Sequence, residues 1–81
     1  MNVVIYSKPD CNYCNLAKEL LRQQGIPFGE NIIGQDIIRE EFVSMYPAVR
    51  TVPHIIIDGV ELGGYTELKN WISQRPQLLE G

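Results

Sequence analysis

The chain has 81 residues, 44% of them hydrophobic, and its ten acidic and seven basic side chains give a net charge of −3. This length predicts one domain over residues 1–81, with only a modest core. The basic residues are scattered singly, which disfavours nucleic acid as a partner, because phosphate binding requires clustered Lys and Arg. No apolar run approaches the length of a membrane span and no signal peptide is recognisable, so we expect a cytoplasmic protein.

The first half of the chain has the pattern of a strand, a helix and a second strand. Residues 2–6, NVVIY, form a β-branched and aromatic run that stops at the turn formers of residues 7–10. Good helix formers follow over residues 13–24, and Gly25 supplies a C-terminal stop. An extended segment runs from Ile26 to Ile32 or Ile33. The predicted inner face of the helix consists of Leu16, Ala17, Leu20 and Leu21.

The second half predicts a helix, a hairpin and a last helix. The second helix covers residues 35–46 and turns Ile37, Ile38, Phe42 and Met45 inward. The hairpin pairs residues 54–57 with residues 60–62 through Asp58-Gly59, a strong turn signal. The last helix covers residues 66–74, with Leu68, Trp71 and Ile72 buried, and residues 75–81 should be a frayed end. We expect an α/β fold in which a right-handed crossover precedes the hairpin, giving a mixed four-stranded sheet.

The two cysteines, Cys11 and Cys14, both lie in the segment KPDCNYC between the first strand and the first helix. A structural disulfide is disfavoured, because the cytoplasm keeps thiols reduced and so short a loop gains little from closure. A zinc site needs four ligands, and the single histidine, His54, brings this set only to three. We expect His54 to be a surface or edge residue. A redox role is therefore favoured over zinc binding or a purely structural role.

The position of the pair at the start of a helix has a chemical consequence. The first backbone N–H groups of a helix lack partners and the helix dipole is positive there. The pKa of Cys11 should therefore fall below that of an ordinary thiol, assisted by Lys8 and opposed by Asp10. We predict Cys11 as the exposed nucleophile and Cys14, one turn later and covered by the helix, as the resolving thiol.

Three segments in this order, KPDCNYC, RTVPHI and GGYTEL, make the chain resemble a glutaredoxin over nearly its whole length. A thioredoxin fits less well, because its usual Trp-Cys-Gly-Pro-Cys and its additional N-terminal strand and helix are not seen. The resemblance implies the thioredoxin fold in its short glutaredoxin form, with a four-stranded mixed sheet and three helices. It also implies a glutathione-dependent thiol–disulfide oxidoreductase that reduces protein disulfides and glutathione mixed disulfides through Cys11 and Cys14.

The resemblance also implies where glutathione binds. The family has a cis bond before the proline that matches Pro53, which leaves the Val52 backbone free to pair with a bound cysteinyl group. Lys8 and Arg50 match positions that serve the glycine carboxylate, and the helix start at Thr66 matches the γ-glutamyl site. Thr66 is also a candidate helix cap, and Asp is commoner than Glu at position 67. The expected glutathione contacts are Lys8, Tyr13, Arg50, Thr51, Val52, Pro53, Gly64, Tyr65, Thr66 and Glu67, whereas Tyr6, Tyr46 and Trp71 are expected in the core or at its rim.

One position departs from the family pattern. Asn12 stands where dithiol glutaredoxins usually carry proline, which restores backbone freedom and an N–H donor. Some glutaredoxins without that proline hold a [2Fe–2S] cluster between two subunits, so a cluster carrier or sensor is the alternative function. We otherwise expect a monomer without a resident metal ion. Its partners would be glutathione and disulfide-containing proteins, with ribonucleotide reductase the first candidate by analogy.

Overall fold

A computed structural model of the chain describes residues 1–74. Its strands form one sheet in the order β2-β1-β3-β4, in which β1 is parallel to β2 and antiparallel to β3, and β3 is antiparallel to β4. This confirms the predicted mixed four-stranded sheet and the three helices. The elements are β1 (Val3–Ser7), α1 (Asn12–Gln23), β2 (Gly29–Ile32), α2 (Arg39–Met45), β3 (His54–Ile57), β4 (Val60–Gly63) and α3 (Tyr65–Gln74).

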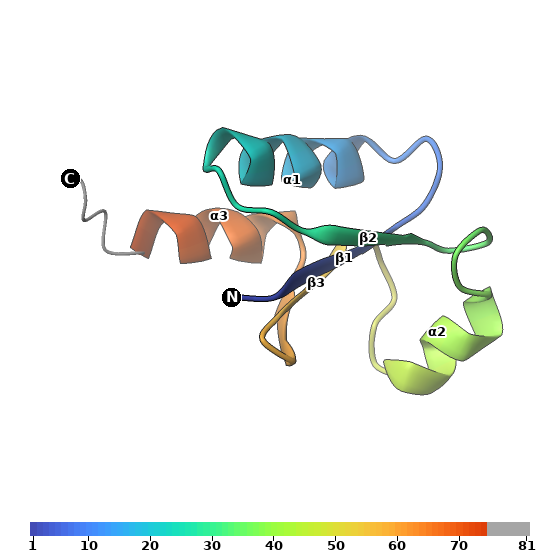
Figure 1. Cartoon of the computed structure of the whole chain (residues 1–81). Coiled ribbons are helices and arrows are strands. Elements are labelled where there is room, and N and C mark those ends of the chain that lie inside the picture. Colours follow the sequence, from blue (N-terminus) through green and yellow to red (C-terminus); the bar gives the residue numbers. More distant parts are fainter. Residues whose placement is uncertain (75–81) are drawn as a thin grey trace.

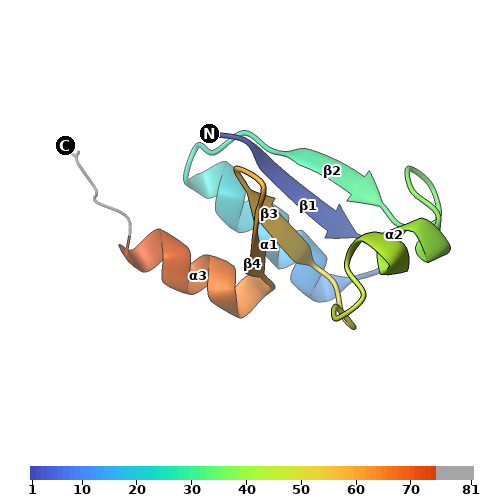
Figure 2. The same cartoon turned by 90° about the horizontal axis from the view of Figure 1, so that it is seen from below.

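The sheet separates two helical layers (Figure 1, and from below in Figure 2). Helices α1 and α3 cover one face and α2 covers the other. Strand β1 contributes to both sides, because successive side chains of a strand point to opposite faces. Val3 and Ile5 join the larger core under α1 and α3, whereas Tyr6 packs with Phe42 and Ile56 under α2. Both faces of β1 are therefore occupied, and the loop that follows β1 starts from a fixed position.

Helix α1 agrees with its predicted range to within one residue at each end. It ends before Gly25, which adopts a φ of 69°, a conformation that glycine takes without strain. Its buried stripe consists of Cys14, Ala17 and Leu21, whose spacing follows the helical period. Leu16 lies beside this stripe and is 47% exposed, so its predicted place on the inner face is wrong.

Helix α2 is shorter than the predicted helix over residues 35–46. A compact turn occupies the first part of that range: Asp36 accepts a hydrogen bond from the Ile32 N–H at 2.8 Å, and Gly34 donates one to the Ile37 carbonyl at 2.8 Å. Because the chain reverses here, the helix starts only at Arg39. The prediction of inward-facing Ile38 and Met45 is wrong, since these side chains are 62% and 49% exposed, whereas Phe42 is buried as predicted.

The hairpin forms as predicted, with positive φ at both Asp58 and Gly59, as a tight primed turn requires. The prediction for His54 is wrong: its side chain is buried on the α2 face, and its Nε2 lies 3.0 Å from Glu61 Oε1. The reason is that His54 lies on the side of β3 that α2 covers, where its ring packs against those of Phe42 and Tyr46. Trp71 packs against the larger core, in agreement with the prediction. The predicted frayed end, residues 75–81, lies outside the described residues.

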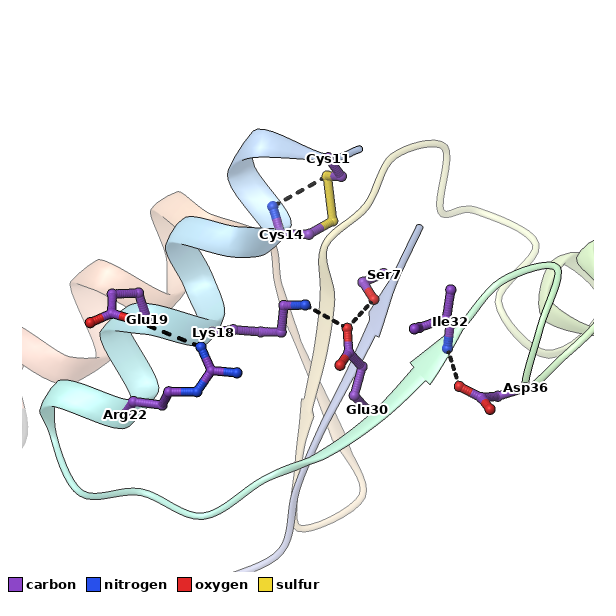
Figure 3. A network of polar contacts seen from close by, with 9 residues as sticks. All are labelled: Ser7, Cys11, Cys14, Lys18, Glu19, Arg22, Glu30, Ile32 and Asp36. Carbon is purple, nitrogen blue, oxygen red and sulfur yellow. Dashed lines mark hydrogen bonds and ion pairs between the residues drawn. A yellow bond between two sulfur atoms is a disulfide. The ribbon is translucent and has the colours of Figure 1, made fainter. Parts of the chain in front are cut away.

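A polar network crosses the interface between α1 and the sheet (Figure 3). Glu30 of β2 accepts a hydrogen bond from the buried Ser7 hydroxyl at 2.6 Å and pairs with Lys18 of α1 at 2.8 Å. The hydrogen bond from Lys18, and after it that from Ser7, lowers the pKa of Glu30 below its ordinary value of 4.5. The network ties the edge strand β2 to the middle of α1. Within the described residues no helix has the length and apolar character needed to cross a membrane.

Replacing Glu30 by Gln should lower the free energy of unfolding at neutral pH by about 1 kcal/mol, because two hydrogen bonds to a half-buried carboxylate are weakened. A carboxylate with a lowered folded pKa stabilises the protein above its unfolded pKa, and this stabilisation is lost as the pH falls through the folded pKa. The difference between the two proteins should therefore narrow as the pH falls from neutral towards about 3 in urea denaturation.

Glu19→Gln is the matched control, since Glu19 is exposed and lies 3.8 Å from Arg22 on the surface of α1. Such pairs contribute little to stability. Equal losses in Glu30→Gln and Glu19→Gln, or a Glu30→Gln loss that does not change with pH, would contradict this role of the network.

Candidate active site

Cys11 and Cys14 are joined by a disulfide at the N-terminal end of α1 (Figure 3). Cys11 is the N-cap residue of the helix: its backbone is extended, and its Sγ accepts a hydrogen bond from the Cys14 N–H at 3.2 Å. Cys14 is 1% exposed and Cys11 is 8% exposed. Cys11 is therefore less accessible in the disulfide form than predicted, although it remains the more exposed of the two.

The Thr-Val-Pro segment limits the exposure of Cys11. The peptide bond between Val52 and Pro53 is cis, as the resemblance implied. The Val52 carbonyl oxygen lies 3.9 Å from Cys11 Sγ, and Pro53 is buried ahead of β3. The backbone of Val52 consequently lies next to Cys11 Sγ.

The Gly-Gly segment lies next to the same loop. A Cβ atom on Gly64 would be 3.4 Å from the Pro53 carbonyl oxygen, so the two backbones lie close together here. Glu67 accepts a hydrogen bond from the Gly64 N–H at 2.9 Å and thereby caps α3, in the manner of a capping box. The alternative in which Thr66 caps the helix is wrong, because α3 begins at Tyr65 and Thr66 lies within its first turn.

A groove of about 1020 Å³ runs from the disulfide towards α2. It brings together six of the predicted site residues, which come from the loop and first turn around the cysteines and from the segment before Pro53. Tyr65 does not line the groove, but its ring centroid is 5.9 Å from that of Tyr13, which does. Gly64, Thr66 and Glu67 do not line it. The predicted residues in the groove are Lys8, Cys11, Tyr13, Arg50, Thr51 and Val52.

The far wall of the groove was not predicted. It is formed by α2 and the segment after it, and no sequence motif marks these residues. The predicted helix over residues 35–46 has Arg39 in its second turn, and only the turn over residues 34–37 brings Arg39 to the start of α2. Among the residues of this wall, only Phe42 could be predicted to face inward, because it fits the spacing of apolar residues in a helix. The residues missed are Ile33, Arg39, Phe42, Val43, Pro47 and Val49.

Aromatic packing supports this wall from behind. The Tyr46 ring lies 5.4 Å from that of Tyr6 and 4.9 Å from that of His54, centroid to centroid. Burial, with a hydrogen bond involving Tyr6, raises the pKa of Tyr46 to about 12. Tyr46 therefore remains a neutral phenol at physiological pH and holds the end of α2 against β1 and β3.

The groove is cationic on its rim. Lys8, Arg39 and Arg50 line it, and none of them forms an ion pair within residues 1–74. Asp10 is the acidic side chain on the same lining. No group of three or more His, Cys, Asp or Glu residues in this part of the chain is arranged to hold a metal ion. The arrangement is that of an anion-attracting groove with a disulfide at one end.

The fold and the cysteine pair define a thiol–disulfide oxidoreductase of the thioredoxin-fold superfamily. The family model named Glutaredoxin matches residues 3–62. The chain is 39% identical to glutaredoxin 3 of Escherichia coli K12 over 67 aligned residues. The alignment covers 83% of this chain and 81% of the relative. The chain belongs to the glutaredoxin family.

A second relative is much longer than this chain. Over 74 residues the chain is 35% identical to the hybrid peroxiredoxin hyPrx5 of Haemophilus influenzae, covering 89% of this chain but only 30% of that protein. The similarity therefore concerns less than a third of that relative.

Solved structures show the same fold. Glutaredoxin 1 from Francisella tularensis, complexed with cacodylate, superposes with a TM-score of 0.75 at 31% identity, covering 90% of this chain and 93% of that one. A buckwheat glutaredoxin–glutathione complex gives a TM-score of 0.74 at 28% identity, covering 88% of this chain and 67% of that one. These neighbours confirm the short thioredoxin fold implied by the sequence.

Replacing Gly63 by Ala tests the packing at the junction between β4 and α3. Gly63 has a φ of 127°, and an added Cβ would lie 2.8 Å from Glu67 Cγ, within the side chain that caps the helix. We expect a loss of about 1–3 kcal/mol in the free energy of unfolding of the oxidised protein, from backbone strain and a displaced cap. Urea denaturation measures it.

The control is Gly29→Ala, because a Cβ at Gly29 meets no atom within 4 Å. A change of less than about 0.5 kcal/mol is expected there. If both variants lost the same stability, the close approach at Gly63 would not be the cause.

Proposed function

We propose that this protein reduces protein disulfides and glutathione mixed disulfides with glutathione as the electron donor. The observation that carries the proposal is the Cys11–Cys14 pair, which lies at a helix N-terminus, beside the Val52 backbone and at the end of a cationic groove. Membership of the glutaredoxin family supports it. So does a structural neighbour that was solved as a glutathione complex.

Glutathione offers groups that fit these surroundings. Its cysteinyl backbone would pair with Val52, which leaves its sulfur next to Cys11. Lys8 and Arg50 would attract its glycine carboxylate, and Tyr13 would cover the sulfurs. Its γ-glutamyl carboxylate would take the N-terminal end of α3, where the backbone of Tyr65 and the Thr66 hydroxyl offer donors. Glu67 already caps α3 by accepting the hydrogen bond from the Gly64 N–H. We therefore propose that Glu67 positions this end of the helix and does not itself bind glutathione.

The exchange steps follow from the two thiols. In the reduced protein the Cys11 thiolate attacks one sulfur of the substrate disulfide, so that a Cys11–substrate bond forms and the other substrate sulfur leaves as a thiolate that takes a proton. The Cys14 thiolate then attacks Cys11 Sγ and releases the remaining substrate thiol. Two molecules of glutathione restore the dithiol in two further exchanges and leave as glutathione disulfide.

The geometry of the pair supports a different role for each thiol. The Cys14 N–H points at Cys11 Sγ at 3.2 Å, and such a donor at a helix N-terminus stabilises a thiolate. Cys14 is covered by α1 and can meet only a sulfur that is already bound at Cys11. We therefore propose Cys11 as the nucleophile and Cys14 as the resolving thiol.

Cluster binding finds less support in the same residues. An iron–sulfur cluster needs several thiolate ligands, and both cysteines of this chain are joined to each other. A cluster would require reduction of this bond and further sulfur ligands from outside the chain. Ribonucleotide reductase as a substrate, a monomeric state and a cytoplasmic location remain predictions.

The first experiment is turnover of a glutathione mixed disulfide by metal-free protein, coupled to glutathione reductase and NADPH. Wild type should turn over. Cys11→Ser should lose at least 99% of this activity, because it lacks the nucleophile, whereas Cys14→Ser should retain it, because glutathione itself resolves the mixed disulfide. Loss of about two orders of magnitude or more is typical when an essential nucleophile is removed.

An assay of protein-disulfide reduction further distinguishes the roles of Cys11 and Cys14. Cys14→Ser should lose most of this activity, because no resolving thiol releases the substrate. No turnover of the mixed disulfide by folded, reduced wild type would contradict the glutathione proposal. An active Cys11→Ser beside an inactive Cys14→Ser would reverse the two roles.

A further inference from the structure

We propose that the groove beside Cys11 selects polypeptide disulfides in which the attacked cysteine is flanked by an acidic residue and a large apolar residue. This deepens the proposed function by naming a substrate class. It rests on thiol–disulfide exchange at Cys11 but not on glutathione as the donor.

The position of the groove, beside the Val52 backbone, fits an extended polypeptide. Its volume is about 1020 Å³, at the upper end of the range for ligand pockets. It extends from the disulfide to α2 and includes Lys8 and Arg50, to which we assigned the glycine carboxylate of glutathione. Because the substrate and glutathione react in separate exchanges, the whole groove, with its wall along α2, is open to the chain that carries the substrate cysteine when that chain binds. Backbone pairing at Val52 would set the direction of that chain.

The charges on the groove favour an acidic neighbour. The other basic residues of the described part of the chain have partners: Lys18 and Arg22 pair with carboxylates, and Lys69 lies over the Tyr65 ring. The three cations without such a partner within residues 1–74 are Lys8, Arg39 and Arg50, and all three line the groove. Asp10 offsets part of this charge. Arg39, at the start of α2, is the cation farthest in sequence from the residues assigned to glutathione.

The apolar part of the wall favours a large apolar side chain. Val43 is 44% exposed, although the residue before it, Phe42, is buried. Pro47 and Val49 continue the same lining beyond the end of α2. An apolar side chain beside the substrate cysteine would cover Val43, while an acidic one would reach Arg39.

The test uses short peptides that contain two cysteines joined in a disulfide, with either Glu or Lys next to the cysteine and Phe on its other side. Pre-reduced protein reacts with each peptide in a single turnover without glutathione, and reduced peptide is quantified after acid quench. Wild type should react about fivefold faster with the Glu peptide at low salt, and this ratio should fall towards one at high salt. The preference would run against the net charge of −3, so overall attraction cannot produce it.

Arg39→Glu should bring the Glu-to-Lys rate ratio to one or below. Arg22→Glu is the matched control, because Arg22 is an exposed arginine outside the groove, and its ratio should equal that of wild type. Equal rates for the two peptides with wild type, or the same shift in both variants, would overturn the acidic preference. Because glutathione is absent, failure here is distinguishable from failure of glutathione-dependent turnover.

The apolar preference has its own comparison, between the Glu peptide with Phe and a twin with Ser in its place. Wild type should prefer Phe by a few-fold. Val43→Ser should reduce this preference, whereas Val60→Ser, at an exposed valine in the hairpin outside the groove, should keep it. If Val43→Ser and Val60→Ser behaved alike, α2 would not form the apolar part of the site.

Discussion

The hydrogen bond from the Cys14 N–H to Cys11 Sγ joins the fold of this protein to its chemistry. A helix needs acceptors for its first N–H groups, and Ser, Thr, Asp or Asn usually supplies one at the N-cap. Here the sulfur of Cys11 takes that position. The atom that caps the start of the helix is thus the atom that we propose as the nucleophile. The donors that would stabilise a thiolate at Cys11 therefore belong to α1 itself.

The rest of the structure holds Cys11 Sγ in place and forms the groove beside it. The large core under α1 and α3 fixes the helix, and the Ser7–Glu30–Lys18 network holds the edge strand beneath it. The smaller aromatic core under α2 holds the opposite wall. Val52 packs against this smaller core and lies beside Cys11 Sγ, so the α2 layer and the start of α1 come together at the candidate site. Exposed side chains along the α2 wall, such as Val43, can vary without changes in the core that supports α1.

Local chemistry made most of the fold predictable. Gly25 and the Asp58-Gly59 turn were predictable because their residue types favour the positive φ that these positions have. Strand β1 was predictable from its apolar run alone. The errors arose where distant residues decide. Asp36 turns back to Ile32, which shortens α2, and this turn leaves Ile38 outside. His54 is buried because Phe42 and Tyr46 pack on its side of β3, and no local sequence pattern records this packing.

The residues of the candidate site likewise fall into those that the sequence predicts and those that depend on packing. Its sulfurs, Lys8 and the Thr-Val-Pro segment could be assigned because their short segments resemble a family. Arg39 and Val43 could not, because they reach the groove only through the packing of α2. This difference bears on specificity. The family segments define a reaction that many substrates can undergo, whereas the α2 wall belongs to the part of this sequence that no motif covers. With a net charge of −3, long-range forces repel an acidic substrate, and the cations of the groove act only within about 10 Å at moderate salt. Selection by this groove is thus a property of the docked complex rather than of the approach to it.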